Sequence, residues 1–424
     1  MSRKLITGLG SILAVAGLAL AGCSSGTVTD ATDAVSSAAS SVANAAGGDR
    51  GPITFAMGSN DKDKITPIID AWNAEHPDEQ VTFADLGQEA DAQREKLVQS
   101  LQAGSGEYDV MALDVVWTGE FAANQWVAPL TGDLATDTTD LLPATVESAT
   151  YNGTLYGLPM NTNGQLLFRN TDQVATAPAT WAELQASCEG IETDCLITQL
   201  KQYEGLTVNT AGFMEGWGGS ILADDGTTPN VDADGSKAGL QALVDGVADG
   251  TISGESTSAT EEETNLAFTE GRVAYAINWP YMYDNAVKAG LNFEVQPLVG
   301  ENGVGVSTLG GYNNAININS EYKATALDFM KFVVNADNQK AFAEASFPPV
   351  LASIYEDPAI IEQFPYMTAL KQSLDAAAPR PVSPFYTAIS KAIQDNAYAA
   401  INGDKDVDTA TADMKAAIEQ ASAA

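Results

Sequence analysis

The stretch that decides the fold covers residues 52–113 and reads PITFAMGSNDKDKITPIIDAWNAEHPDEQVTFADLGQEADAQREKLVQSLQAGSGEYDVMAL. Its apolar runs predict three strands, at residues 52–57, 81–83 and 108–113. Between them, apolar residues recur at helical spacing and predict helices over residues 61–75 and 90–103. The last strand is almost continuously apolar, as expected of a strand in a sheet covered on both faces. The alternation predicts an α/β fold built from right-handed strand-helix-strand units.

The rest of the chain continues in the same manner, without an internal sequence repeat. We expect further strands at residues 273–278 and 293–298, and helices over 324–334, over 338–347 and from 384 to 401. Removing the first 51 residues leaves roughly 375, more than one hydrophobic core usually holds. The sequence therefore predicts two lobes.

The amino-terminal segment has the form of an export signal. Ser2-Arg3-Lys4 supplies positive charge, and the apolar run that follows is too short for a stable membrane span. It ends at Leu20-Ala21-Gly22-Cys23, which resembles a bacterial lipobox. Residues 1–22 would then be a lipoprotein signal peptide, Cys23 the lipidated residue, and residues 23–51 a flexible tether. An ordinary signal with a chance cysteine is the alternative.

Charge and cysteine content narrow the classes of function. The formal charge of −36, from 56 acidic and 20 basic residues, disfavours binding to nucleic acid. With one histidine and only Cys188 and Cys195 besides Cys23, no metal site or cofactor is expected. In an exported protein these two cysteines predict a disulfide that closes a small loop. Two free thiols are the alternative.

Several motifs, in this order along the chain, together resemble the extracellular solute-binding proteins of sugar ABC importers. They are Tyr108-Asp109-Val110 with Asp114-Val115-Val116-Trp117, Asn152 to Pro159, Leu167-Phe168-Arg169-Asn170 and Ala267 to Ala274. Three more resemble the maltose/trehalose branch: Asn278-Trp279-Pro280-Tyr281, Leu309-Gly310-Gly311-Tyr312 and Pro379-Arg380-Pro381-Val382.

The resemblance implies a two-lobed α/β fold with a ligand cleft between the lobes. One lobe would hold residues 52–158 and 293–340, and the other residues 159–292 and 341–424. It also implies a monomer, lipid-anchored at the outer face of the cell membrane, that captures a disaccharide and delivers it to the membrane subunits of an ABC importer. Among disaccharides, the resemblance favours trehalose as the ligand. Closure of the lobes on the ligand would be the mechanism.

Candidate ligand residues in the first lobe follow strands. Asp114 comes just after the strand at 108–113, where open α/β sheets bind ligands, and Trp117 lies three residues on. Asn60 and Asp61 follow the strand at 52–57. Carboxylates and amides can bond two sugar hydroxyls at once. The alternatives are helix capping for the polar residues and plain packing for Trp117.

Further candidates lie at turns of the chain. Asn161 and Asn163 follow Pro159, and Trp279 and Tyr281 flank Pro280 and could stack on a sugar ring. The adjacent glycines of Gly310-Gly311-Tyr312 would let the backbone approach a ligand. The alternatives are a polar turn, core packing and a simple turn, respectively.

Three charged or aromatic candidates remain. Arg380, between two prolines, could clamp hydroxyls with its guanidinium fork, or it could form a structural ion pair. Glu215 and Trp217 are weaker candidates. The run Glu261-Glu262-Glu263 is interpreted as a solvated face or the first turn of a helix.

Two other classes of function remain open. A lipid-anchored glycoside hydrolase would use paired carboxylates, and a binding protein could instead take maltose, a longer glucan, a peptide or a polyamine. We expect a binding protein and not an enzyme.

Overall fold

The first of two main sheets contains the three strands predicted within residues 52–113. The computed structural model describes residues 49–223 and 226–422. The sheet order is β2 (Val81–Asp85), β1 (Ile53–Met57), β3 (Val110–Asp114), β11 (Gly310–Ile316) and β6 (Leu158–Asn163). β1 is parallel to β2 and β3, whereas β11 runs antiparallel to both β3 and β6. The parallel part of the sheet thus confirms the prediction from the sequence.

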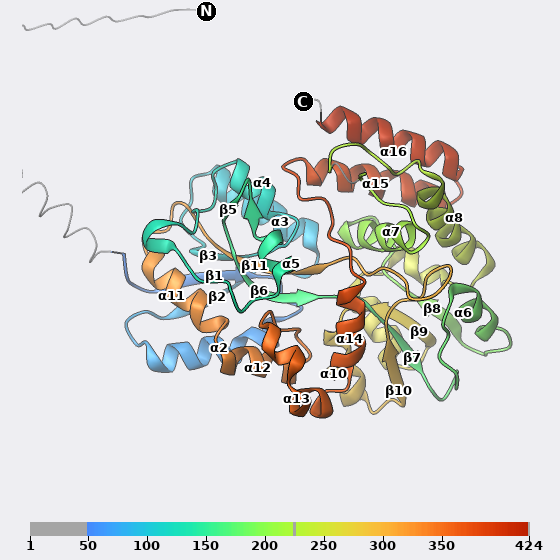
Figure 1. The fold of residues 1–424 in the computed structure, drawn as a ribbon, viewed down its shortest axis with the longest axis horizontal. Helices are drawn as coiled ribbons and strands as arrows, with labels where there is room; N and C mark the ends of the chain where they lie inside the picture. Colours follow the sequence, from blue (N-terminus) through green and yellow to red (C-terminus); the bar gives the residue numbers. More distant parts are fainter. Residues whose placement is uncertain (1–48, 224–225, 423–424) are drawn as a thin grey trace, which may run out of the picture. The chain divides into compact units, whose positions relative to one another are not determined.

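Helices cover both faces of this sheet (Figure 1). On one face, Phe55 and Ala112 pack in a core with α2 (Lys62–Glu75) and α11 (Lys323–Val333). On the other, Met111 and Leu113 pack with α3 (Ala90–Gln102) and α4 (Thr118–Ala123). Burial on both faces explains why β3 is apolar at every position before its last residue, Asp114.

The second sheet has the order β10 (Phe293–Gln296), β7 (Leu166–Asn170), β9 (Val273–Asn278) and β8 (Asp194–Ile197). One core joins it to α6 (Trp181–Ser187), α7 (Glu204–Gly216), α8 (Asp234–Asp249), α15 (Tyr386–Ile401) and α16 (Val407–Ser422). A separate core joins it to α9 (Glu261–Thr269) and α10 (Tyr281–Ala289). The protein therefore has two sheet-centred lobes.

The expected lobe boundaries differ from the structure in three places. β6 pairs with β11 in the first sheet, although residues from 159 on were expected in the second lobe. β10 pairs with β7 in the second sheet, although residues 293–296 were expected in the first lobe. Phe342 and Phe347 pack in the first lobe's core, although residues from 341 on were expected in the second. Strand pairing and core packing decide all three placements, and neither is visible in local sequence periodicity.

Shorter elements complete the described residues. They are η2 (Gly132–Leu134), α5 (Pro143–Ser148), β4 (Thr150–Tyr151), β5 (Thr154–Leu155), η3 (Gly254–Ser258), α12 (Ala336–Glu344), η4 (Ala352–Glu356), α13 (Pro358–Gln363) and α14 (Tyr366–Asp375). Within residues 49–223 and 226–422, no helix combines the length and apolar character needed to cross a membrane. The expected signal peptide, Cys23 and nearly all of the tether lie outside the described residues.

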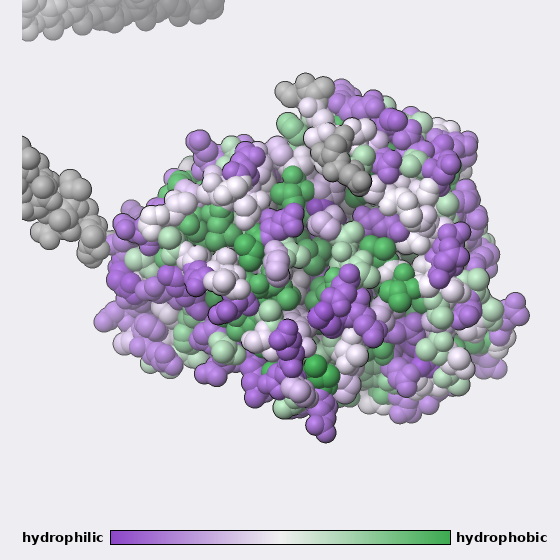
Figure 2. Space-filling model, in the orientation of Figure 1, coloured by the Kyte–Doolittle hydropathy of each residue, from purple (hydrophilic) through white to green (hydrophobic). Residues whose placement is uncertain are grey.

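Hydrophilic residues predominate toward the margins of the face drawn in Figure 2, and apolar residues show between them nearer the middle. The chain passes between the two sheets after β6, before β11 and again after α12. The segment after α14 is tied to the residues before β11, because Leu309 N donates to Ala378 O at 2.8 Å and Ala378 N to Ser307 O at 2.9 Å. This pairing places Arg380 between the lobes.

Candidate functional site

A cavity between the two lobes gathers residues from both sheets. The empty space inside it, counted together with its open mouth, is about 730 Å³. Ten of the residues proposed from the sequence line it: Asn60, Asp61, Asp114, Asn163, Trp279, Tyr281, Gly310, Gly311, Tyr312 and Arg380.

Strand geometry explains the first-lobe wall. β1 and β3 are parallel, so their carboxyl ends meet at one edge of the sheet. Asp61 follows β1 and Asp114 ends β3. β11 runs the other way and places Tyr312 directly opposite Asp114. Three segments far apart in the sequence therefore meet at the same edge.

Asp61 is a buried carboxylic acid on this wall. Its residue is 8 % exposed, and its side chain makes no capping hydrogen bond to α2, so the capping alternative does not apply. Burial raises the pKa of Asp61 to about 7, against the opposing effect of Lys64. A buried carboxyl group needs a hydrogen-bond donor, and a group in the cavity could supply one.

Arg380 links the lobes through two carboxylates. Its side chain is 2 % exposed; Nη1 donates to Glu204 Oε1 at 2.6 Å and Nη2 to Asp114 Oδ1 at 2.9 Å. Asp114 belongs to the first lobe and Glu204 begins α7 in the second. Asp114 Oδ1 also accepts from Val116 N at 3.2 Å. Arg380 therefore forms structural ion pairs, as the alternative interpretation of the sequence expected, and it also lines the cavity.

Glu204 is the buried acid of this network. Tyr386 Oη donates to its Oε1, and Ser390 Oγ donates to its Oε2 at 2.5 Å. Burial raises the pKa of Glu204 to about 7, although Arg380 acts in the opposite direction. At neutral pH this carboxyl group is therefore close to its titration midpoint.

Aromatic side chains form the opposite wall. Trp279 follows β9, and Pro280 is the N-cap of α10, which begins at Tyr281. Trp279 lies so close to β11 that a Cβ added at Gly310 would approach its ring to 3.0 Å. Tyr281 Oη donates to the Glu261 carbonyl at 3.2 Å. Aromatic faces beside carboxylates suit a ligand with both apolar faces and hydroxyl edges.

Comparisons with known proteins agree with this architecture. The family described as "Bacterial extracellular solute-binding protein" matches residues 68–369. The chain belongs to this family. A probable ABC transporter-binding protein of Deinococcus radiodurans is 28 % identical over 362 residues, which cover 78 % of this chain and 83 % of that protein.

Solved structures show the same fold. Maltose-bound T. maritima MalE3 matches with a TM-score of 0.82 and 27 % identity, over 87 % of this chain and 99 % of that one. The GacH receptor of Streptomyces glaucescens, solved unliganded and with acarbose, matches with a TM-score of 0.79 and 24 % identity, over 88 % of this chain and 98 % of that one. At 24 % identity the second likeness bears on the fold alone. This solute-binding protein thus has the two-lobed fold predicted from its sequence.

Four residues proposed from the sequence of this solute-binding protein lie outside the cavity lining. Trp117 is 3 % exposed and packs in the first lobe's core, 6.4 Å from the Phe121 ring. Asn161 is 1 % exposed, and its Oδ1 accepts from Tyr312 N at 2.9 Å. Trp117 thus serves packing, and Asn161 holds β6 to β11.

Glu215 and Trp217 are the other two. They lie at the far end of α7 from Glu204, about 16 Å along the helix at 1.5 Å per residue. Trp217 stacks on Phe213 with ring centroids 5.4 Å apart. Burial raises the pKa of Glu215 to about 8, and its Oε2 has no hydrogen-bond partner among the described residues.

The sequence interpretation missed two acids that line the cavity, Glu204 and Glu261. Glu204 opens α7, whose next ten residues are all buried; a lone acid at the start of such an apolar helix was the available signal. Glu261 does lie in the first turn of α9, but it is half-buried and not fully solvated. Its carboxylate accepts from Tyr203 Oη at 2.7 Å, and burial raises its pKa.

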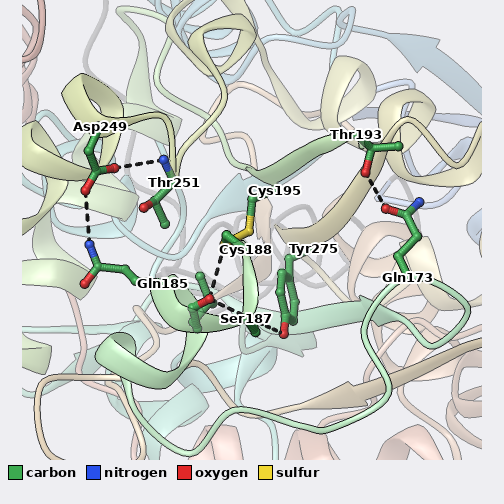
Figure 3. Close-up of a disulfide and its surroundings, with 10 residues drawn as sticks. Gln173, Gln185, Ser187, Cys188, Thr193, Cys195, Asp249, Thr251 and Tyr275 are labelled. Carbon is green, nitrogen blue, oxygen red and sulfur yellow. Dashed lines mark hydrogen bonds between the residues drawn. A yellow bond between two sulfur atoms is a disulfide. The ribbon is translucent and has the colours of Figure 1, made fainter. Parts of the chain in front are cut away.

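The predicted disulfide between Cys188 and Cys195 is present, with Cα atoms 5.5 Å apart. Figure 3 shows it beside the hydrogen bond between Ser187 and Tyr275, which measures 2.8 Å. Neither cysteine lines the cavity between the lobes. The disulfide therefore ties α6 to β8 within the second lobe.

Proposed function

We propose that this protein captures a disaccharide of the maltose/trehalose kind, trehalose in particular, and delivers it to an ABC importer. The observation that carries the proposal is the cavity in which carboxylates, one arginine and aromatic rings converge from two lobes. Hydroxyls would bond to Asp61, Asp114 and Arg380, and ring faces would stack on Trp279. The likeness to maltose-bound MalE3 and the motifs at residues 278–281, 309–312 and 379–382 support this ligand class.

A calorimetric titration with trehalose, maltose and maltotriose tests the ligand class. We expect saturable heat with trehalose and weaker or no binding of maltotriose. Asp61→Asn should weaken binding by about 1.5–3 kcal/mol, the value of a hydrogen bond to a charged group. The matched control is Asp70→Asn, because Asp70 is an exposed acid on α2, the helix that Asp61 precedes. Equal affinities for these two variants would contradict the assignment of Asp61.

The same sugars separate this function from the rival class. A glycoside hydrolase would release monosaccharides during prolonged incubation, whereas we expect every disaccharide to be recovered intact. Appearance of glucose above a protein-free control would favour the enzyme. Peptides and polyamines in the titration panel address the other binding classes.

Anchoring is the second half of the proposed function. We propose that the mature protein is a monomer held at the outer face of the cell membrane by lipid on Cys23. Cys23→Ala should shift the protein from the membrane fraction to the soluble fraction, or block its processing. An unchanged membrane fraction would contradict the lipid anchor.

A further inference from the structure

Two ion pairs join the lobes without lining the ligand cavity. Lys201 Nζ lies 2.9 Å from Glu89 Oε2, and Lys64 Nζ lies 3.5 Å from Asp284 Oδ2. None of these four residues lines the cavity. Each pair takes one partner from the first lobe and one from the second.

The first pair borders the cavity. Glu89 precedes α3, and its neighbours Gln88 and Ala90 line the cavity. Lys201 belongs to the second lobe, because its backbone N donates to Ala259 O at 3.3 Å. The side chains are 41 % and 36 % exposed, so solvent and salt screen their attraction.

The second pair is more deeply placed. The Lys64 side chain on α2 is 3 % exposed, and its ammonium is shared between Asp63 at 3.0 Å and Asp284 at 3.5 Å. Asp284 on α10 also holds Lys288 at 2.5 Å. A buried ammonium requires charged or hydrogen-bonding partners. Separation of the lobes would remove Asp284 from Lys64 and leave the first-lobe acids Asp63 and Asp61.

We propose that Lys64 and Lys201 are positioning residues that set ligand affinity through lobe closure, without touching the ligand. The proposal rests on the proposed binding function. Each pair exists only while the lobes are together, so it stabilises the closed form over the open form. In a chain with a formal charge of −36, repulsion between acidic lobes opposes closure. A lysine facing an acid across the gap offsets that repulsion.

Affinity responds to such contacts because the apparent dissociation constant scales inversely with the population of the binding-competent state. A pair as exposed as Lys201–Glu89 changes that population about two- to fivefold. The less exposed Lys64–Asp284 pair should change it by about tenfold. The first effect should fade at high salt and the second should persist.

The test uses Glu89→Gln and Asp284→Asn, which keep side-chain shape and remove charge. Lys288→Met removes only the pair between Lys288 and Asp284 within α10 and is the control for Asp284→Asn. Asp375→Asn, which breaks an exposed pair with Lys371 inside α14, is the control for Glu89→Gln. Sugar affinity is measured calorimetrically at low and high salt, and the radius of gyration by small-angle X-ray scattering with and without sugar.

Both test variants should weaken sugar binding, by about two- to fivefold for Glu89→Gln and tenfold for Asp284→Asn, and should increase the sugar-free radius of gyration. The controls should match the wild type. If the test variants match their controls in both measurements, the proposal is wrong. The scattering measurement needs no ligand. If the wild type binds no sugar, the proposed function is wrong, but the radius of gyration of the sugar-free variants still tests whether the two ion pairs favour lobe closure.

Discussion

The substitution Arg380→Met removes a cation that bonds to both Asp114 and Glu204. From the sequence alone, Arg380 was expected either to clamp ligand hydroxyls or to form a structural ion pair. The structure gives it a structural role, because the guanidinium makes bonds of 2.6 Å and 2.9 Å to these two carboxylates. We therefore expect Arg380→Met to destabilise the sugar-free protein.

The size of the loss follows from the surroundings. Breaking a buried ion pair by removing one partner typically costs about 3–5 kcal/mol. Two features of this site reduce that free-energy cost. The Asp114 side chain is 18 % exposed and can be hydrated. Burial already raises the pKa of Glu204 to about 7, so that Glu204 can take a proton near neutral pH at little cost. A loss of about 3 kcal/mol is expected.

The pH dependence of this loss has a definite sign. Arg380 lowers the pKa of Glu204, so its removal raises that pKa further above the unfolded value. An acid with a raised folded pKa stabilises the fold below its unfolded pKa and loses that contribution as pH rises through the folded pKa. The destabilisation by Arg380→Met should therefore be larger at pH 8 than at pH 6.

Denaturant unfolding of the sugar-free protein at both pH values measures the effect. Arg272→Met is the control, since its pairs with Glu255 and Glu270 are exposed and should contribute at most about 1 kcal/mol. Equal unfolding free energies for the wild type and Arg380→Met at pH 8 would refute a structural role for these bonds. A destabilisation without any pH dependence would refute the role assigned to Glu204.

Three further outcomes are expected. Replacing Cys188 and Cys195 together by serine should lower the unfolding free energy by about 2–3 kcal/mol, because the closed loop is short, and calorimetry should find sugar affinity unchanged. Glu215→Gln should stabilise the protein by about 1–2 kcal/mol at pH 8 and have little effect near pH 4. Burial raises the pKa of Glu215 to about 8, so the wild type loses stability as pH rises toward that value. Urea unfolding between these pH values measures how the unfolding free energy of each protein changes with pH. Gly310→Ala should weaken sugar binding by about 1–3 kcal/mol, because the added methyl group would meet the Trp279 ring at 3.0 Å; unchanged binding heats would contradict the position of Trp279 in the ligand site.

The sequence by itself determined the local elements and the class of fold. In strands such as Val110–Asp114 and helices such as Lys62–Glu75, the spacing of apolar residues is set by which faces are buried. That spacing can be recognised within a few residues of sequence. The disulfide was equally accessible, since Cys188 and Cys195 were the only pair left in an exported chain. Asp114, which ends β3, and Asp61, which follows β1, were predicted at the cavity for the same local reason.

Only the tertiary structure decided which distant segments meet. It places β11 between β3 and β6, and β10 in the second sheet, because strand pairing depends on the packing of whole lobes. It also joins Arg380 to Glu204 across 176 residues of sequence. A buried charge is stable only beside a compensating partner, and here that partner comes from a distant segment of the chain. Local sequence patterns do not show which distant residues will be neighbours. The roles of Glu204, Glu261 and the two lysines between the lobes could therefore be seen only in the fold.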